Sequence, residues 1–69
     1  MRVMVRKTGD DYSVYVPKKD VESAVVAMEM PTLWGGWVEL GNGWRLGMPD
    51  MAPDTRLPIT VQARRISAG

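Results

Sequence analysis

The 69-residue sequence contains no cysteine and no histidine. Disulfide bonds are therefore impossible, and metal sites built on thiolate or imidazole ligands are excluded as well. The same absence removes the Cys and His nucleophiles and the usual general base near neutral pH. Fe–S clusters need thiolate or imidazole ligands, so this chain is a poor candidate for a cluster carrier. We expect a protein that folds by packing alone and holds no cofactor of its own.

The sequence also lacks an excess of one charge and any long apolar run. Nine basic and eight acidic side chains give a net charge of +1, without the clustered basic footprint typical of nucleic-acid-binding proteins. No apolar stretch approaches the ~18 residues of a membrane span, and the N-terminal stretch has no signal-peptide core. We therefore expect an intracellular, cytoplasmic protein with no membrane partner, and nucleic acid is disfavoured as a ligand. The length allows one small domain.

Two segments with alternating apolar residues open the sequence. Four valines occupy alternate positions in them: Val3, Val5, Val14 and Val16. A period of two is typical of half-buried strands. Pairing Val5 with Val14 places all four valines on one face and sets Met4 opposite Tyr15 on the other. This register predicts a β-hairpin closed by a four-residue loop at 8–11.

The next segment, 21–30, allows two interpretations. Pro17 ends the hairpin because proline cannot donate a strand hydrogen bond. Asp20 could cap a short helix, but the β-branched pair Val25–Val26 favours a strand. We favour a strand near 24–29 and keep a helix as the alternative.

A second hairpin surrounds the Gly-Asn-Gly sequence at 41–43. A three-residue loop there pairs Val38 with Leu46 and Glu39 with Arg45. One face of the hairpin then becomes apolar, and an ion pair lies on the other. A two-residue turn would shift the register by one and place apolar residues opposite charged ones, so the three-residue loop is favoured.

This register also fixes the direction of two tryptophans. Gly43 can supply the positive φ that such a loop needs, without steric cost. Trp44 is predicted to point inward with Leu40. Trp37 is predicted to lie on the outer face, opposite Gly47.

The last part of the chain combines a loop with a closing strand. Residues 48–58 contain three prolines and two aspartates, which predicts a surface connection. Apolar residues then alternate with polar ones: Leu57, Ile59, Val61 and Ala63. This alternation predicts a closing strand with Pro58 at its start, where a missing donor matters least. Residues 67–69 are predicted to form a flexible tail.

Together these segments predict an all-β, mainly antiparallel protein. We expect a single β-barrel-like domain of five to six short strands over residues 1–66. Curling is favoured because a flat sheet of this size would leave one apolar face exposed to water.

No residue pattern in the sequence indicates catalysis. The eight carboxylates show no spacing that implies a buried pair with separated pKa values. Asp50 and Asp54 could in principle hold a cation through oxygen ligands, but no EF-hand pattern is present. We therefore predict no catalytic, cofactor-binding or metal-binding residue, and hence no enzyme.

The most unusual sequence is Trp-Gly-Gly-Trp at 34–37. Its rings could form an exposed platform for a partner, although glycines that let both rings cover the barrel end are the simpler interpretation. We predict a partner-binding surface made of Trp37, Arg45 and the basic corner Lys18–Lys19. The alternative is a barrel that binds single-stranded nucleic acid through Trp and Arg.

Three blocks of the sequence are familiar in this order and spacing: SVYVPKKD at 13–20, MEMPTLWGGWVELGNGWRL at 28–46 and DTRLPITVQAR at 54–64. They resemble the NifT/FixU family of small nitrogen-fixation proteins, and the likeness covers nearly the whole chain. The resemblance implies a compact β-barrel-like fold and an accessory part in nitrogenase or iron–molybdenum cofactor maturation. It further implies a nitrogenase component or a nitrogen-fixation assembly protein as partner. The family supplies no catalytic residues to transfer.

Overall fold

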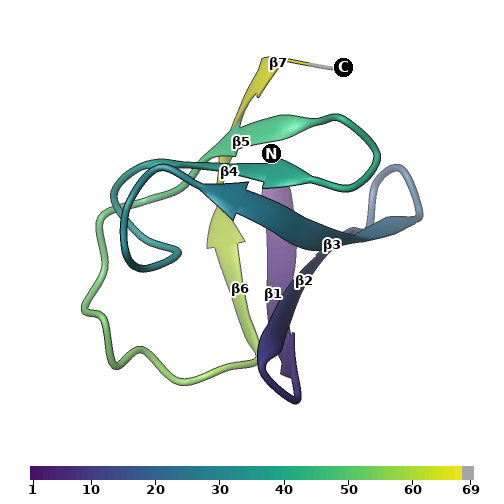
Figure 1. Cartoon of the computed structure of the whole chain (residues 1–69). Helices are drawn as coiled ribbons and strands as arrows, with labels where there is room; N and C mark the ends of the chain where they lie inside the picture. The colour runs from purple at the N-terminus through teal and green to yellow at the C-terminus, as the bar shows by residue number, and fades with distance from the viewer. Residues whose placement is uncertain (68–69) are drawn as a thin grey trace.

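A computed structural model describes residues 1–67 and shows seven strands in one antiparallel sheet (Figure 1). The strands are β1 (Arg2–Thr8), β2 (Asp11–Val16), β3 (Val21–Met28), β4 (Trp37–Leu40), β5 (Arg45–Gly47), β6 (Ile59–Gln62) and β7 (Arg64–Ser67). Their order across the sheet is β6-β1-β2-β3-β4-β5-β7. Residues 1–67 contain no helix, and therefore none that could cross a membrane. The predicted all-β, barrel-like architecture is confirmed, with seven strands in place of five to six.

The first hairpin has the predicted register but a shorter loop. Val5 pairs with Val14, and Met4 pairs with Tyr15. The ladder continues to a pair between Thr8 and Asp11, so the loop holds two residues and the predicted four-residue loop is wrong. Gly9 lies at a φ of 63°. A glycine at positive φ allows the tight two-residue turn, and the strands stay paired up to it.

Strand β3 settles the ambiguity of segment 21–30 in favour of a strand. It runs over Val21–Met28 and pairs with β2 on one side and β4 on the other. The backbone groups of β3 form hydrogen bonds with β2 and β4, and these bonds outweigh the weak helix-capping signal of Asp20. Asp20 instead ends the β2–β3 turn at a φ of 52°, a conformation that Asp tolerates better than most residues. A register shift between Val25 and Ala27 leaves Val26 exposed.

The second hairpin follows the predicted three-residue loop. Val38 pairs with Leu46 and Glu39 pairs with Arg45. Gly43 has a φ of 95°, as the loop requires. The Leu40 N–H donates to the Trp44 carbonyl at 2.8 Å, which closes the hairpin.

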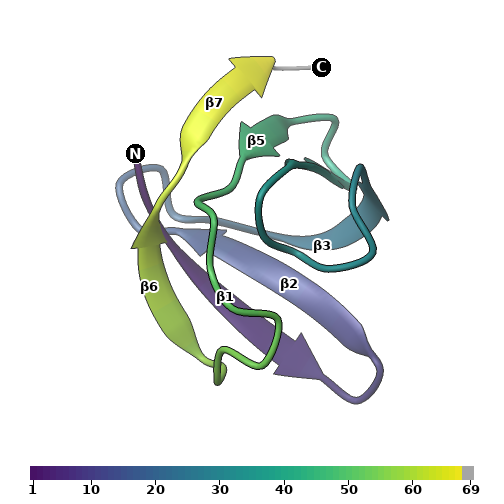
Figure 2. The same cartoon turned by 90° about the vertical axis from the view of Figure 1, so that its left-hand side faces the viewer.

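One continuous segment, β6 followed by β7, provides both ends of the curled sheet. Strand β6 pairs with β1, whereas β7 pairs with β5. Figure 2 shows β6 running on into β7, with a bend between them at Ala63. The sheet therefore curls strongly but is not closed, because no ladder joins β6 to β5. The predicted tail at 67–69 begins with Ser67, whose backbone pairs with Arg45; residues 68–69 lie outside the described residues.

The core consists of side chains from the strands and from two loops. Seven side chains are fully buried: Val3, Val5, Val14, Val16, Val38, Leu40 and Leu46. Leu33 and Trp34 join them from the loop between β3 and β4. Segment 48–58, predicted to be a surface connection, also contributes buried Met48 and half-buried Leu57. The segment is otherwise mostly exposed, as predicted, and these two apolar side chains pack against the core.

Candidate functional site

Trp37 is the first residue of β4 and lies on the outer face of the sheet, as predicted. It pairs with Gly47 across the β4–β5 ladder. Because Gly47 has no side chain, the indole ring borders a shallow floor of backbone. A Cβ added to Gly47 would lie 3.5 Å from the Cδ1 of Ile66, which borders the same floor from β7. Trp37 is half-buried and Ile66 is 55% exposed, so both offer apolar surface to a ligand.

Arg45 holds the ring of Trp37 in place. Its guanidinium carbon lies 4.6 Å from the centroid of the Trp37 ring, and its Nε donates to Glu39 Oε1 at 3.0 Å. The predicted ion pair is therefore present. A solvent-exposed ion pair contributes little to stability, and a cation–π contact at an exposed site contributes about 0.5–1 kcal/mol. These contacts place Arg45 between the Trp37 ring and the Glu39 carboxylate.

An open hollow of about 490 Å³ lies beside this tryptophan, and we call it the Trp37 hollow. Its lining comprises Glu29, Gly35, Gly36, Trp37, Gly47, Met48, Pro49, Gln62, Ala63, Arg64 and Ile66. The Trp37 N–H donates to Glu29 Oε1 at 3.3 Å. A Cβ on Gly36 would lie 2.7 Å from the Met30 Cγ and 2.9 Å from Glu29 Oε1. Glycine at position 36 therefore lets the Glu29 side chain reach the backbone of Trp37.

The basic corner lies away from this hollow. Lys18 and Lys19 occupy the turn that precedes β3, whereas Trp37 is bonded to Glu29 just beyond the other end of β3. Strand β3 is 8 residues long, which corresponds to roughly 25 Å in an extended chain. The structure thus brings Trp37 and Arg45 together and places the two lysines at the other end of the strand.

The other two tryptophans have different environments. Trp34 is 5% exposed and belongs to the core. Trp44 is half-buried against the core, as its predicted inward direction implies. The guanidinium carbon of Arg65 lies 4.2 Å from the centroid of its ring. Trp34 also borders a hollow, of about 90 Å³, whereas Trp37 borders the one of about 490 Å³.

Sequence reasoning missed Gln62, Arg64 and Ile66 as residues of this site. The alternating pattern ended at Ala63, and after it the sequence predicted only a flexible tail at 67–69. Trp37 opposite Gly47 was the available signal, since an aromatic ring beside a glycine leaves room for a third group. Only the pairing of β7 with β5 identifies that group as Ile66.

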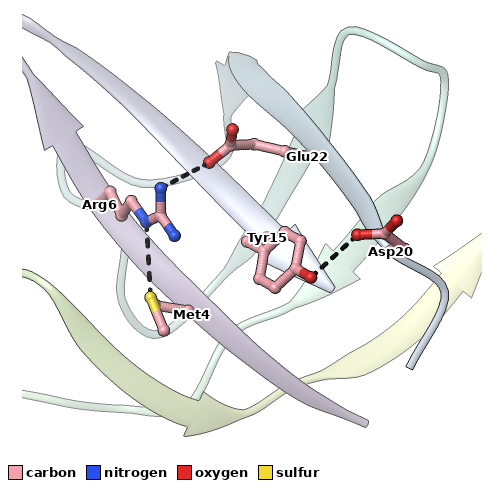
Figure 3. Close-up of polar contacts among 5 residues, drawn as sticks. All are labelled: Met4, Arg6, Tyr15, Asp20 and Glu22. Carbon is pink, nitrogen blue, oxygen red and sulfur yellow. Dashed lines mark hydrogen bonds and ion pairs between the residues drawn. The ribbon is translucent and has the colours of Figure 1, made fainter. Parts of the chain in front are cut away.

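A separate polar cluster covers the outer face of β1, β2 and β3 (Figure 3). Arg6 forms an ion pair with Glu22 at 3.1 Å, and its Nε donates to the sulfur of Met4 at 3.4 Å. The Tyr15 hydroxyl donates to Asp20 Oδ1 at 3.0 Å. The Arg6–Glu22 pair reaches from β1 across β2 to β3, Arg6–Met4 lies within β1, and Tyr15–Asp20 joins β2 to the turn before β3. All three contacts are exposed, so we interpret them as local stabilisation of the sheet.

One of these contacts predicts a measurable pH effect. The hydrogen bond to Asp20, together with its negative charge, raises the pKa of Tyr15 above its ordinary value of 10.0. The folded state thus holds the phenol proton more tightly than the unfolded state. The contact stabilises the fold below about pH 10 and is lost as the pH rises through the folded-state pKa.

Spectrophotometric titration of a Tyr12→Phe protein isolates Tyr15 and should give a pKa above that of a model tyrosine peptide. Adding Asp20→Asn should move this pKa back toward 10.0, because the amide keeps an acceptor oxygen but removes the charge. An unchanged pKa in the Asp20→Asn protein would contradict the assignment.

The carboxylates do not form a site. Seven of the eight are exposed and Glu39 is half-buried. Residues 1–67 contain no group of three or more Asp and Glu side chains placed to hold a metal ion. Among these residues, no third carboxylate lies close enough to Asp50 and Asp54 to complete a metal site with them. The chemistry that the described surface offers is binding through an apolar hollow bordered by charged groups.

Comparison with known proteins identifies the family. Residues 1–63 match the profile of the NifT/FixU protein family. The chain belongs to this family. The resemblance inferred from the three sequence blocks is therefore confirmed, and the protein is associated with nitrogen fixation.

Three relatives show how far the similarity extends. The chain is 56% identical over 66 residues to a FixU homolog of Sinorhizobium fredii, covering 96% of this chain and 87% of that protein. It is 52% identical over 65 residues to FixU of Rhizobium leguminosarum bv. trifolii, covering 94% of this chain and 93% of that protein. It is also 47% identical over 66 residues to MosB of Rhizobium meliloti, covering 96% of this chain but 13% of MosB. A NifT/FixU-like domain thus also occurs as a small part of a longer protein.

Proposed function

We propose that this protein is a non-catalytic accessory factor that binds another protein in nitrogenase or iron–molybdenum cofactor maturation. The partner is a nitrogenase component or an assembly protein of the same process. The observation that carries the proposal is the Trp37 hollow. It offers an oriented indole, an exposed isoleucine and charged rims, which is the composition typical of a protein-binding surface.

The residue types favour a protein partner over a metal cluster. The sequence has no cysteine or histidine to ligate iron. The described carboxylates are dispersed on the surface, so they offer no buried acid–base pair. Occurrence of a similar domain within the longer MosB also suits a binding module. These features support an accessory role without chemistry of its own.

The nucleic-acid alternative is weaker on structural grounds. Guanidinium groups lie against the rings of both partly exposed tryptophans, Arg45 on Trp37 and Arg65 on Trp44. A base stacking on those ring faces would have to displace an arginine that already interacts with the ring. The net charge of +1 also provides little electrostatic attraction for a phosphate backbone.

Affinity capture from nitrogen-fixing cells tests the proposal. A tagged wild-type protein should retain a nitrogenase component or an assembly factor of nitrogen fixation, identified by mass spectrometry. Trp37→Ala should weaken that capture at least about tenfold, because a central aromatic residue commonly contributes more than 1–2 kcal/mol to an interface.

A matched control comes from the basic corner. The double variant Lys18→Ala/Lys19→Ala changes an exposed turn away from the hollow and should capture the same protein at the wild-type level. Recovery of no nitrogen-fixation protein by the wild type would refute the proposal. Equal losses in the tryptophan and lysine variants would refute the assignment to the Trp37 hollow.

A further inference from the structure

The Trp37 hollow coincides with the place where the barrel fails to close. Strands β6 and β7 are the two ends of the sheet order, yet a single residue, Ala63, separates them along the chain. Within β7, one edge of this continuous segment pairs with β5. Within β6, the same edge has no neighbouring strand among residues 1–67. The hollow lies at this change, since Gln62, Ala63 and Arg64 all line it.

The hydrogen-bond pattern shows where the Gln62 backbone points. Met1 and Ala63 exchange two bonds, from the Met1 amine to the Ala63 carbonyl at 2.6 Å and from the Ala63 N–H to the Met1 carbonyl at 2.7 Å. In an antiparallel ladder the next pair, Arg2 with Gln62, is a non-hydrogen-bonded pair. The N–H and C=O of Gln62 therefore point away from β1, toward the open edge.

Pro49 explains why β5 does not pair with that edge. The β5–β7 ladder pairs Leu46 with Arg65 and Gly47 with Arg64. Continued in the same register, it would place Pro49 opposite Gln62. Proline has no N–H to donate, and the Pro49 carbonyl already accepts the Gly35 N–H at 3.0 Å. The ladder ends there, and Gln62 and Pro49 border the same hollow.

Charges on the rim indicate which ligand would fit. Arg2 lies opposite Gln62 on β1, and Arg64 follows two residues later on β7. Both side chains are exposed, and neither forms an ion pair among the described residues. The carboxylate on the far wall, Glu29, already accepts the Trp37 N–H. Arg64 is therefore the cation that lines the hollow beside Gln62, whereas Arg2 borders a separate hollow with Lys18.

We propose that this edge binds an extended, acidic peptide segment of the partner protein by β-strand addition. One residue of the segment exchanges two backbone hydrogen bonds with Gln62. A neighbouring apolar side chain lies over Gly47, between Trp37 and Ile66, and an acidic side chain meets Arg64. An unpaired strand edge beside side-chain pockets is the arrangement used in this mode of recognition. The inference rests on the proposed function, for which it supplies the binding mode.

Selection from a phage-displayed library of random dodecapeptides tests the inference without knowledge of the partner. The wild-type protein should enrich peptides that combine apolar and acidic residues. Synthetic forms of these peptides should slow hydrogen exchange at the Gln62 amide. No enrichment, or protection confined to the turn at Lys18 and Lys19, would overturn the inference.

The substitution Gln62→Pro separates backbone from side-chain recognition. It removes an N–H that points away from β1, so the β1–β6 ladder is kept, and proline is tolerated on an edge strand. It should weaken binding of the selected peptides at least about tenfold, since it removes one bond and blocks approach of a second strand. Gln62→Ala retains the N–H and should bind more tightly than Gln62→Pro. Equal binding by all three proteins would overturn the inference.

A charge exchange provides a second route that does not depend on the proline variant folding. Arg64→Glu should disfavour acidic peptides and enrich basic ones in a new selection, whereas Arg64→Lys should keep the wild-type preference. Unchanged selection by Arg64→Glu would overturn the acidic preference. Self-association of the chain through this edge, or competition by an oligothymidylate for the same amide, would overturn the peptide as occupant.

The outcomes distinguish this inference from the proposed function. If Gln62→Pro captures the same nitrogen-fixation protein as the wild type, the accessory role holds and strand addition is wrong. If the wild type captures no such protein, the proposed function fails, while the library selection still reports whether the edge binds peptides.

Discussion

Replacing Trp34 with alanine is expected to unfold a large fraction of the protein. The indole is 5% exposed and is part of the core cluster. Truncating a buried tryptophan costs about 3–5 kcal/mol. A domain of 69 residues has a total stability on the order of 3–10 kcal/mol, at roughly 0.05–0.15 kcal/mol per residue. The loss is therefore comparable with the whole free energy of unfolding.

Urea denaturation followed by far-UV circular dichroism measures this effect. The matched control is Trp37→Ala, which removes the same side chain three positions later from the outer face. Its cost should stay near 1 kcal/mol, since it removes a half-buried ring and an exposed cation–π contact. Similar denaturation midpoints for the two variants would mean that Trp34 is not a core residue.

The second large effect is expected at Leu46. Its side chain is fully buried at the centre of β5, where the backbone pairs with Val38 of β4 and with Arg65 of β7. Leu46→Ala should lower the free energy of unfolding by about 2–5 kcal/mol, through lost apolar burial and the cavity that remains.

A second variant at position 46 tests whether the loss of side-chain volume causes this destabilisation. Leu46→Met keeps most of the side-chain volume and should cost less than about 1.5 kcal/mol. Val26→Ala provides an exposed reference, since Val26 is 60% exposed, and should change stability by less than about 0.5 kcal/mol. Denaturant titrations of the three variants check the order. A Leu46→Ala protein as stable as Val26→Ala would contradict the structure.

The registers of the two hairpins could be predicted from the sequence because alternation and turn chemistry are local, whereas β7 was not predicted as a strand. A one-residue slip would have exposed the valines of the first hairpin or placed Leu46 opposite a charge. The loop at 8–11 was predicted too long because Thr8 and Asp11 are polar residues typical of turns. Nothing in the sequence indicates that they continue the strand ladder.

The candidate site was only half predictable for a related reason. Trp37 and Arg45 lie in one hairpin, so the local register brought them together. Lys18 and Lys19 were grouped with them by residue type, and a sequence pattern does not contain the distance along β3 that separates them. Gln62, Arg64 and Ile66 join the site through the pairing of β7 with β5, which connects parts of the chain far apart in sequence.

The bond between the first residue and Ala63 spans 62 positions of the chain, and it sets the order in which this protein can fold. Strands β2 to β5 each pair with the strand that precedes them, so these ladders can form successively as the chain leaves the ribosome. Strand β1 must keep its outer edge unpaired until residues 59–62 have been synthesised. Such distant pairings slow folding, because chain entropy is lost before the contacts compensate for it. The synthesis of residues 59–62 thus determines how long β1 keeps an unpaired edge that can pair with another chain.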